Sequence, residues 1–169
     1  MANVNTNAMK QAKLFGNSPF GNLTALPFHF ETNASGIALN TDLATAVQVA
    51  DVVRIGILPA GMTLMDANII VSDAFTAATT ASIGFLYTDG VDVTAVPQDA
   101  AYFVSALDTA TAAATRKTGV KAPVVLPKDA WLTLTIGGAA HAAVGVLDVI
   151  VQGIHTGEVA GSLASQQNP

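Results

Sequence analysis

Two apolar runs that meet at a Pro-Ala-Gly sequence constrain this chain more than any other feature. The first run covers residues 52–58 and the second covers residues 62–71, with Pro59 and Gly61 between them. Proline fixes φ and donates no ladder hydrogen bond, while glycine accepts the positive φ that a tight reversal needs. The pattern therefore predicts a corner between two strands. We expect these strands to be adjacent and antiparallel, with the rest of an all-β domain built outward from them.

Alternation of apolar and polar residues marks further strands, because side chains on a strand point to opposite faces in turn. In residues 131–136 the even-numbered side chains are aliphatic and share one face, and residues 144–154 alternate in a similar way. Together the candidate strands are residues 23–31, 37–39, 52–58, 62–71, 81–87, 102–104, 124–126, 131–136 and 144–154. We predict an all-β fold, an antiparallel β-sandwich or jelly roll of about 8–10 short strands separated by turn signals.

One segment, residues 108–119, is ambiguous. Asp108 is a suitable N-cap and Gly119 follows the last possible helical residue, which predicts a short helix. Four threonines and the lack of an apolar stripe are equally typical of a surface loop on a sandwich. Both interpretations, helix and loop, remain open at this point.

Residues 1–22 have the composition of an extended N-terminal arm, with too little apolar surface to offset the cost of ordering the backbone. Its charged residues are Lys10 and Lys13, and its aromatic residues are Phe15 and Phe20. We predict that these four side chains contact a partner or another subunit. The alternative is a disordered tail whose phenylalanines fold back on their own domain.

The rest of the chain divides into a β-domain, residues 23–155, and a predicted flexible C-terminal tail, residues 156–169. Residues 1–30 carry two lysines and no acidic residue, whereas the remainder carries five basic and twelve acidic residues. A basic arm on an acidic body is suited to docking on an acidic neighbour.

The composition limits the partners of the protein. Only 11% of the 169 residues are charged, which predicts that another subunit or a partner covers part of the surface. A net charge of −5 with seven basic residues argues against binding to nucleic acid. The chain has no cysteine, no apolar run long enough for a membrane span and no signal-peptide pattern at its start. We expect a soluble protein made in the cytoplasm, with no membrane partner.

No arrangement of residues predicts catalysis or a metal site. The histidines at positions 29, 141 and 155 lack the spacing of metal ligands, and Asp89 and Asp92 are too few for a convincing calcium site. The segment 88–92 therefore predicts a hairpin turn. No phosphate-binding loop or nucleophile elbow occurs. We expect a protein that is not an enzyme, binds no cofactor and acts by binding.

The runs at residues 52–64, 131–140 and 145–151 resemble the small jelly-roll or β-sandwich proteins encoded beside the major capsid protein of tailed bacteriophages. These are capsid decoration, or cement, proteins, and the resemblance covers roughly residues 28–155. It implies a structural virion protein that sits on the outer capsid surface as a dimer or trimer. Its partners would be the major capsid protein and further copies of itself, and it would clamp neighbouring capsomers. No contact motif of the family can be matched to residues here.

Two other functions compete with this interpretation. A receptor- or glycan-binding sandwich of a phage tail fibre or head fibre would place aromatic and acidic side chains in one set of loops, whereas Trp131 and both tyrosines lie in or beside predicted strands. A small hydrolase would need histidine and carboxylates to converge in a pocket.

Overall fold

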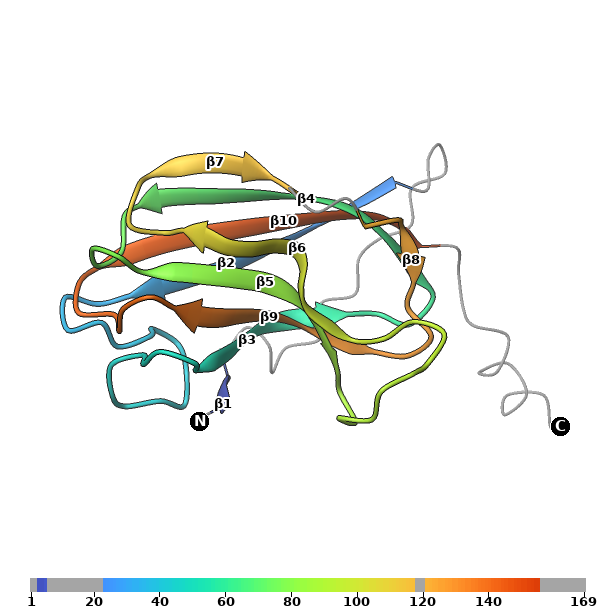
Figure 1. Cartoon of the computed structure of the whole chain (residues 1–169), viewed down its shortest axis with the longest axis horizontal. Helices are drawn as coiled ribbons and strands as arrows, with labels where there is room; N and C mark the ends of the chain where they lie inside the picture. The colour runs from blue at the N-terminus through green and yellow to red at the C-terminus, as the bar shows by residue number, and fades with distance from the viewer. Residues whose placement is uncertain (1–2, 6–22, 118–120, 156–169) are drawn as a thin grey trace, which may run out of the picture.

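The computed structural model describes residues 3–5, 23–117 and 121–155, and the described chain folds into two packed β-sheets (Figure 1). None of the described residues is helical, so none belongs to a helix that could cross a membrane. The strands are β1 (Asn3–Asn5), β2 (Leu23–Thr32), β3 (Val52–Leu58), β4 (Met62–Asp73), β5 (Thr80–Tyr87), β6 (Asp99–Asp108), β7 (Ala113–Arg116), β8 (Val124–Val125), β9 (Ala130–Gly137) and β10 (Gly145–His155). The predicted all-β sandwich is confirmed.

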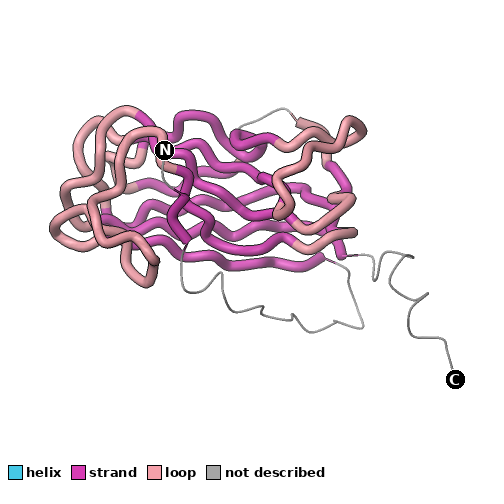
Figure 2. The backbone as a smooth tube through the Cα atoms, turned by 90° about the horizontal axis from the view of Figure 1, so that it is seen from below, coloured by secondary structure: helices cyan, strands magenta, loops and turns pink. Residues whose placement is uncertain are grey.

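The strands form two sheets whose order differs from the order of the sequence. Sheet I has the order β1-β3-β9-β5-β6, and sheet II has the order β2-β10-β4-β7, with β8 paired to β4 beside β7. All pairs are antiparallel except β1 with β3. The strands run along the long axis of the molecule, and the connecting loops gather at its two ends (Figure 2).

The expected hairpin at residues 52–71 is wrong, although both of its strands exist. β3 pairs with β9 in sheet I, whereas β4 pairs with β10 in sheet II, so the Pro59–Gly61 corner carries the chain from one sheet to the other. Gly61 has a φ of 77°, as a tight reversal requires, and its N–H donates to the Leu126 carbonyl at 2.8 Å. The local turn signal was correct, but it does not specify whether the second strand joins the same sheet.

The core lies between the two sheets and follows the predicted alternation. In β9, Leu132, Leu134 and Ile136 are buried against the opposite sheet. In β10 the inner side chains are those of Leu147, Val149 and Val151, and the residues between them face outward. Burial of each such aliphatic side chain contributes about 1.5–3 kcal/mol to folding, so this alternation is the main source of sandwich stability.

Residues 108–117, the described part of the segment 108–119, form neither the helix nor the plain loop that the sequence suggested. β6 continues to Asp108, and the four residues of β7 pair with β4 opposite residues 68–71. The pairing extends past β7, because the Lys117 N–H donates to the Ala67 carbonyl at 2.9 Å. Small Ala and Thr side chains suit an edge strand, and the free edge of β4 supplies hydrogen-bond partners that a local pattern cannot show.

The start of the predicted arm is described, whereas most of the arm and the predicted tail are not. Asn3–Asn5 pair with residues 52–54, so the start of the predicted arm lies along the edge of sheet I. Lys10, Lys13, Phe15 and Phe20, like the predicted tail 156–169, lie outside the described residues. The arm contacts and the tail therefore stay predictions.

The free edge of β2 is poorly suited to strand addition. The Glu31 carbonyl faces away from β10, because it accepts the Leu39 N–H at 2.9 Å. Four residues earlier on the strand, the backbone groups of Pro27 point to the same side as those of Glu31. Proline has no N–H, so it offers no donor at this edge. The missing donor limits pairing with another chain, which favours contacts through faces or loops.

Candidate interaction surfaces

The outer face of β3, β9 and β5 in sheet I, apart from the row that ends at Asp108 on the edge strand β6, is almost free of charge. We call it the neutral face, and it consists of three rows of cross-strand partners, which are Val52, Thr135 and Ser82, then Arg54, Thr133 and Gly84, then Ile57, Trp131 and Leu86. Opposite partners share a face, so these side chains all point away from the core. Arg54 is the one charged residue among the nine positions, and its guanidinium lies 5.8 Å from the centre of the Trp131 ring.

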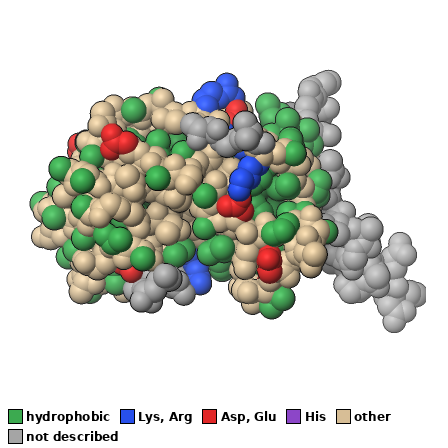
Figure 3. Space-filling view, viewed as in Figure 1, with side chains coloured by type: hydrophobic (Ala, Val, Ile, Leu, Met, Phe, Trp, Pro, Cys, Tyr) green, Lys and Arg blue, Asp and Glu red, His purple; other side chains and the backbone are tan. Residues whose placement is uncertain are grey.

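Charged side chains are also sparse in the space-filling view of the molecule, where they are scattered among hydrophobic and neutral groups (Figure 3). The neutral face combines apolar residues with uncharged hydroxyls. Most of these residues are half-buried, and Thr133 is buried beside Gly84, whose carbonyl accepts its hydroxyl hydrogen bond. Such a face can be covered by another protein with little loss of charge solvation.

The outer face of sheet II has the opposite character. We call it the acidic face, and it carries the acidic side chains Glu31, Asp66, Asp73 and Asp148, with His29 and Arg116 beside them. Arg116 forms an ion pair with Asp66. The excess of carboxylates makes this face costly to bury and suited to contact with water.

His29 lies at the centre of the polar contacts on the acidic face. Its Nδ1 is 2.7 Å from the Asp148 carboxylate, and its Nε2 is 3.5 Å from the Glu31 carboxylate. The hydrogen bond that His29 donates to the Asp148 carboxylate raises the pKa of His29, partial burial opposes that change, and Glu31 adds to the increase. The His29 side chain is 54% exposed, so water screens these interactions.

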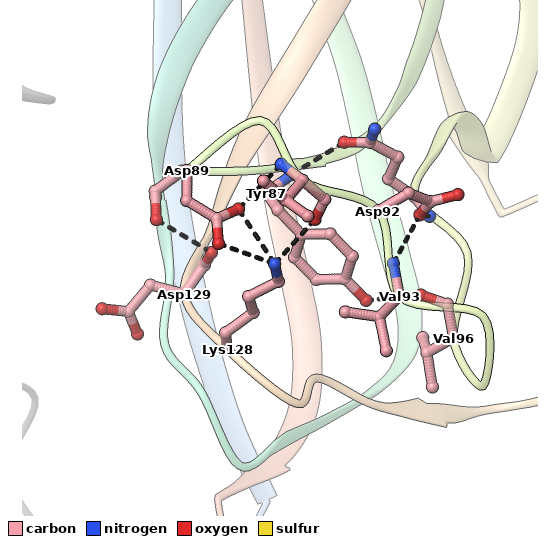
Figure 4. A network of polar contacts seen from close by, with 10 residues as sticks. Tyr87, Asp89, Asp92, Val93, Val96, Lys128 and Asp129 are labelled. Atoms are coloured by element: carbon pink, nitrogen blue, oxygen red, sulfur yellow. Dashed lines mark hydrogen bonds and ion pairs between the residues drawn. The ribbon is translucent and has the colours of Figure 1, made fainter.

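One end of the sandwich is held together by polar contacts, and we call it the polar end (Figure 4). The Lys128 ammonium lies 2.7 and 3.0 Å from the two Asp89 oxygens and donates to the Val91 carbonyl at 2.6 Å. The Asp129 carboxylate accepts the Ala60 N–H at 2.8 Å. Two consecutive residues before β9 thus fix both the β5–β6 loop and the corner between the sheets.

The carboxylates of residues 88–92, the segment with two possible calcium ligands, are engaged in contacts at this end. Lys128 lowers the pKa of Asp89 through its hydrogen bond, and the Val91 N–H contributes to the same effect. The Asp92 carboxylate accepts N–H groups of Val93 and Gln98 at 2.9 and 2.8 Å. In the described part of the chain, no group of three metal-binding side chains converges. These contacts are those of the predicted turn.

The other end of the sandwich is held by aromatic contacts, and we call it the aromatic end. The rings of Phe30 and Phe75 stack with their centres 5.8 Å apart. The His141 ring lies 4.7 Å from the centre of the Phe75 ring and 6.1 Å from that of Phe30. Burial lowers the pKa of His141 from 6.5 to about 4, so the imidazole is neutral at pH 7.

The structure does not bring the histidines into a common site. His29 lies on the acidic face, His141 is enclosed at the aromatic end, and His155 is exposed at the end of β10. The space beside His141 is lined mainly by core side chains and leaves no room for a substrate. Histidine and carboxylates do meet at His29, Asp148 and Glu31, but there the His29 side chain is 54% exposed on the acidic face.

Sequence reasoning missed the contrast between the two faces, although part of the signal was present. The outward positions of residues 131–136 are Trp131, Thr133 and Thr135, none of which is charged. The last strand places Asp148 on its outward face. The sequence thus distinguishes strands whose outward residues are uncharged from strands whose outward residues include carboxylates. The assignment of each strand to a sheet requires the structure.

The fold is thus a two-sheet β-sandwich with one neutral and one acidic outer face. No protein-family model and no curated protein sequence matches the chain. Among solved structures, a chain of "Capsid of Ralstonia phage GP4" is similar with a TM-score of 0.64 and 13% identity, over 93% of this chain and 100% of that chain. A chain of "Cyanophage Pam1 capsid asymmetric unit" is similar with a TM-score of 0.50 and 13% identity, over 86% of this chain and 95% of that one. At this identity the likeness shows a shared fold.

Proposed function

We propose that this protein is a structural virion protein that binds the outer surface of a phage capsid and clamps neighbouring capsomers. The observation that carries the proposal is the likeness to a chain of the Ralstonia phage GP4 capsid, which extends over all of that chain and nearly all of this one. Because one fold can serve many functions, the proposal rests on an analogy at the level of the fold, which covers the whole domain rather than a small motif. No chemical step is part of this function.

The neutral face is the surface that docks on the shell in this proposal. Contact of a capsid protein with Ile57, Trp131 and Leu86 buries apolar area, which stabilises association by about 25 cal/mol per Å² before the costs of ordering. Covering the acidic face instead removes water from four carboxylates, for which the neighbouring His29 and Arg116 supply too few cations. The acidic face therefore points away from the particle.

Repetition on the particle strengthens a modest contact. The partners are the major capsid protein and other copies of this chain, in a dimer or trimer, and each additional contact on the lattice is made at high local concentration. Lys10, Lys13, Phe15 and Phe20 of the N-terminal arm extend the contact area beyond the sandwich in this proposal. The low content of charged residues, 11%, supports packing against neighbours.

A pair of matched substitutions tests which face docks. Leu86→Lys places a charge on the neutral face, and Ile150→Lys places the same charge on the acidic face, at an equally half-buried apolar position in a central strand. Each purified variant is mixed with shells of the capsid protein from the same virus, and bound copies are counted after sedimentation. We expect Leu86→Lys to reduce occupancy at least tenfold, because about 1.4 kcal/mol per site suffices for that change, and Ile150→Lys to bind normally.

The control for this experiment is the thermal unfolding of both variants, which should be similar. Normal occupancy by Leu86→Lys would exclude the neutral face as the docking surface. Failure of the unsubstituted chain to bind any shell would contradict the proposed function itself.

The alternative, a glycan-binding sandwich of a tail fibre or head fibre, has less support. Sugar sites commonly use exposed aromatic rings, but Trp131 belongs to the neutral face and Tyr87 and Tyr102 are buried. The described loops present no exposed aromatic side chain. Binding to host-cell sugars without binding to shells would favour this alternative.

A further inference from the structure

His141 is a buried polar side chain with no hydrogen-bond partner. It is 3% exposed, and neither ring nitrogen has a hydrogen-bond partner within the described part of the chain. Buried polar atoms in native proteins are nearly always paired, so an unpaired imidazole requires an explanation. A phenylalanine or leucine of similar size would fill this space without the desolvation cost that the imidazole imposes. The position thus carries a group that weakens the core but can be protonated.

No charged group of the described residues faces the imidazole from the elements packed around it. The enclosing side chains come from β2, β5, β9, β10 and the segments after β4 and β6, and all are apolar except Thr109, whose hydroxyl donates to Thr79. The carboxylates on these elements, those of Glu31, Asp73, Asp108 and Asp148, lie on the surface. Asp51 is buried, and its carboxylate accepts the Gln48 N–H at 2.9 Å. A proton on the ring would therefore have no counter-ion.

The segment that carries His141 holds two other loops of the aromatic end. The His141 N–H donates to the Val47 carbonyl at 2.9 Å, and the Ala142 N–H donates to the Thr76 hydroxyl at 2.7 Å. Gly36 packs so tightly on the His141 carbonyl that an added Cβ would lie 2.1 Å from its oxygen. Gly36 also has a φ of 72°, which favours glycine. Moving the ring out of the core therefore disturbs the 33–51 loop and the β4–β5 loop together.

We propose that His141 is an acid-sensitive anchor, and that its protonation releases the loops of the aromatic end while the polar end stays closed. The charged ring is stable only when water reaches it, so protonation favours the conformation in which residues 138–144 leave the core. The neutral ring returns to its place beside Phe30 and Phe75 when the pH rises. The behaviour belongs to the isolated chain and does not depend on the proposed role in a capsid.

The size of the effect follows from the two protonation equilibria. The imidazole takes up its proton at about pH 4 in the closed form and near pH 6.5 when solvated, so the closed form loses stability as the pH falls below 6.5 and loses no more below about 4. Between pH 7.5 and pH 5 the open fraction should rise about 30-fold. This rise is specific to the aromatic end.

Hydrogen exchange of backbone amides on the full chain tests the proposal. Exchange rates at pH 7.5 and pH 5, each divided by the intrinsic rate at that pH, are compared for the amides of His141 and Val47 at the aromatic end. The amides of Gly61 and Thr88 report on the polar end. We expect an increase of about 30-fold at the aromatic end and little change at the polar end. Equal changes at both ends, or no change at either end, would overturn the proposal.

Two variants and one titration complete the test. His141→Phe should abolish the pH response of the aromatic end, whereas His29→Gln should retain it, because His29 lies outside the core. Retention of the response in His141→Phe would overturn the assignment. If this variant does not fold, the NMR titration of the His141 ring in the unsubstituted chain decides, with a pKa near 4 expected and a pKa of 6.5 or higher contradicting the proposal.

Discussion

The two ends of the sandwich differ in the side chains that hold their loops. At the polar end, Lys128 and Asp129 reach exposed carboxylate and backbone groups, and water can replace these contacts when they break. At the aromatic end, Phe30, Phe75 and His141 pack inside the core, where water cannot replace a lost contact. The number of polar contacts at an end therefore does not by itself predict how much that end contributes to the free energy of unfolding. The aromatic end should be the more sensitive of the two to substitution and to acid.

The largest expected effect breaks the aromatic end. Phe30→Ala removes a ring that is buried and stacked on Phe75 and leaves a cavity beside His141, so we expect a loss of about 3–5 kcal/mol in the free energy of unfolding. Urea denaturation followed by circular dichroism measures the loss. A loss below about 1 kcal/mol would show that the loops close over the cavity and that the two ends are equally tolerant.

A smaller effect is expected when the polar end loses its contact to the corner between the sheets. Asp129→Ala removes the carboxylate that accepts the Ala60 N–H, but water can reach that amide, so we expect a loss of about 1 kcal/mol. The Asp129 carbonyl still accepts the Thr88 N–H in this variant. Urea denaturation under the same conditions gives the comparison. A loss as large as that of Phe30→Ala would remove the distinction between the two ends.

The smallest effect concerns the exposed ion pair of the polar end. Asp89→Asn removes the charge that Lys128 contacts, and we expect a slight loss of stability that disappears at about 1 M salt, where charges are screened within a few Å. Thermal unfolding of both proteins at low and high salt measures this difference. Because the amide oxygen of the Asp89→Asn side chain can still accept the Val91 N–H, a loss that is independent of salt would show that Asp89 does not act through its charge.

The two ends should also differ in the pH range of their response. Lys128 lowers the pKa of Asp89, so this contact stabilises the fold above the ordinary aspartate pKa of 3.8 and is lost as the pH falls through its lower, folded value. His141 acts at higher pH, because stability is lost from pH 6.5 down to about 4. Following amides of both ends from pH 7 to pH 3 should therefore show the aromatic end responding first. The reverse order would contradict the assignment of both groups.

The alternation of residues predicted much of the fold but little of its connectivity. The faces of β9 and β10 agree with the pattern of Leu132, Leu134 and the later valines, because the pleat of a strand fixes side-chain direction locally. The corner at Pro59–Gly61 was predicted correctly, but the pairing of its two strands was not. Residues 113–116 became a strand only because β4 offers a free edge, which no local pattern reports.

The character of the candidate surfaces was also predictable only in part. The sequence by itself determined a low-charge β-domain with a chemically plain surface, since composition and alternation are local properties of the chain. Only the tertiary structure decided that uncharged outward residues collect on β3, β9 and β5, whereas Glu31, Asp66, Asp73 and Asp148 collect on the outer face of sheet II. It also placed Lys128 against Asp89 and packed His141 beside two stacked phenylalanines. These contacts join residues far apart in sequence, and their choice depends on the packing free energy of the whole sandwich.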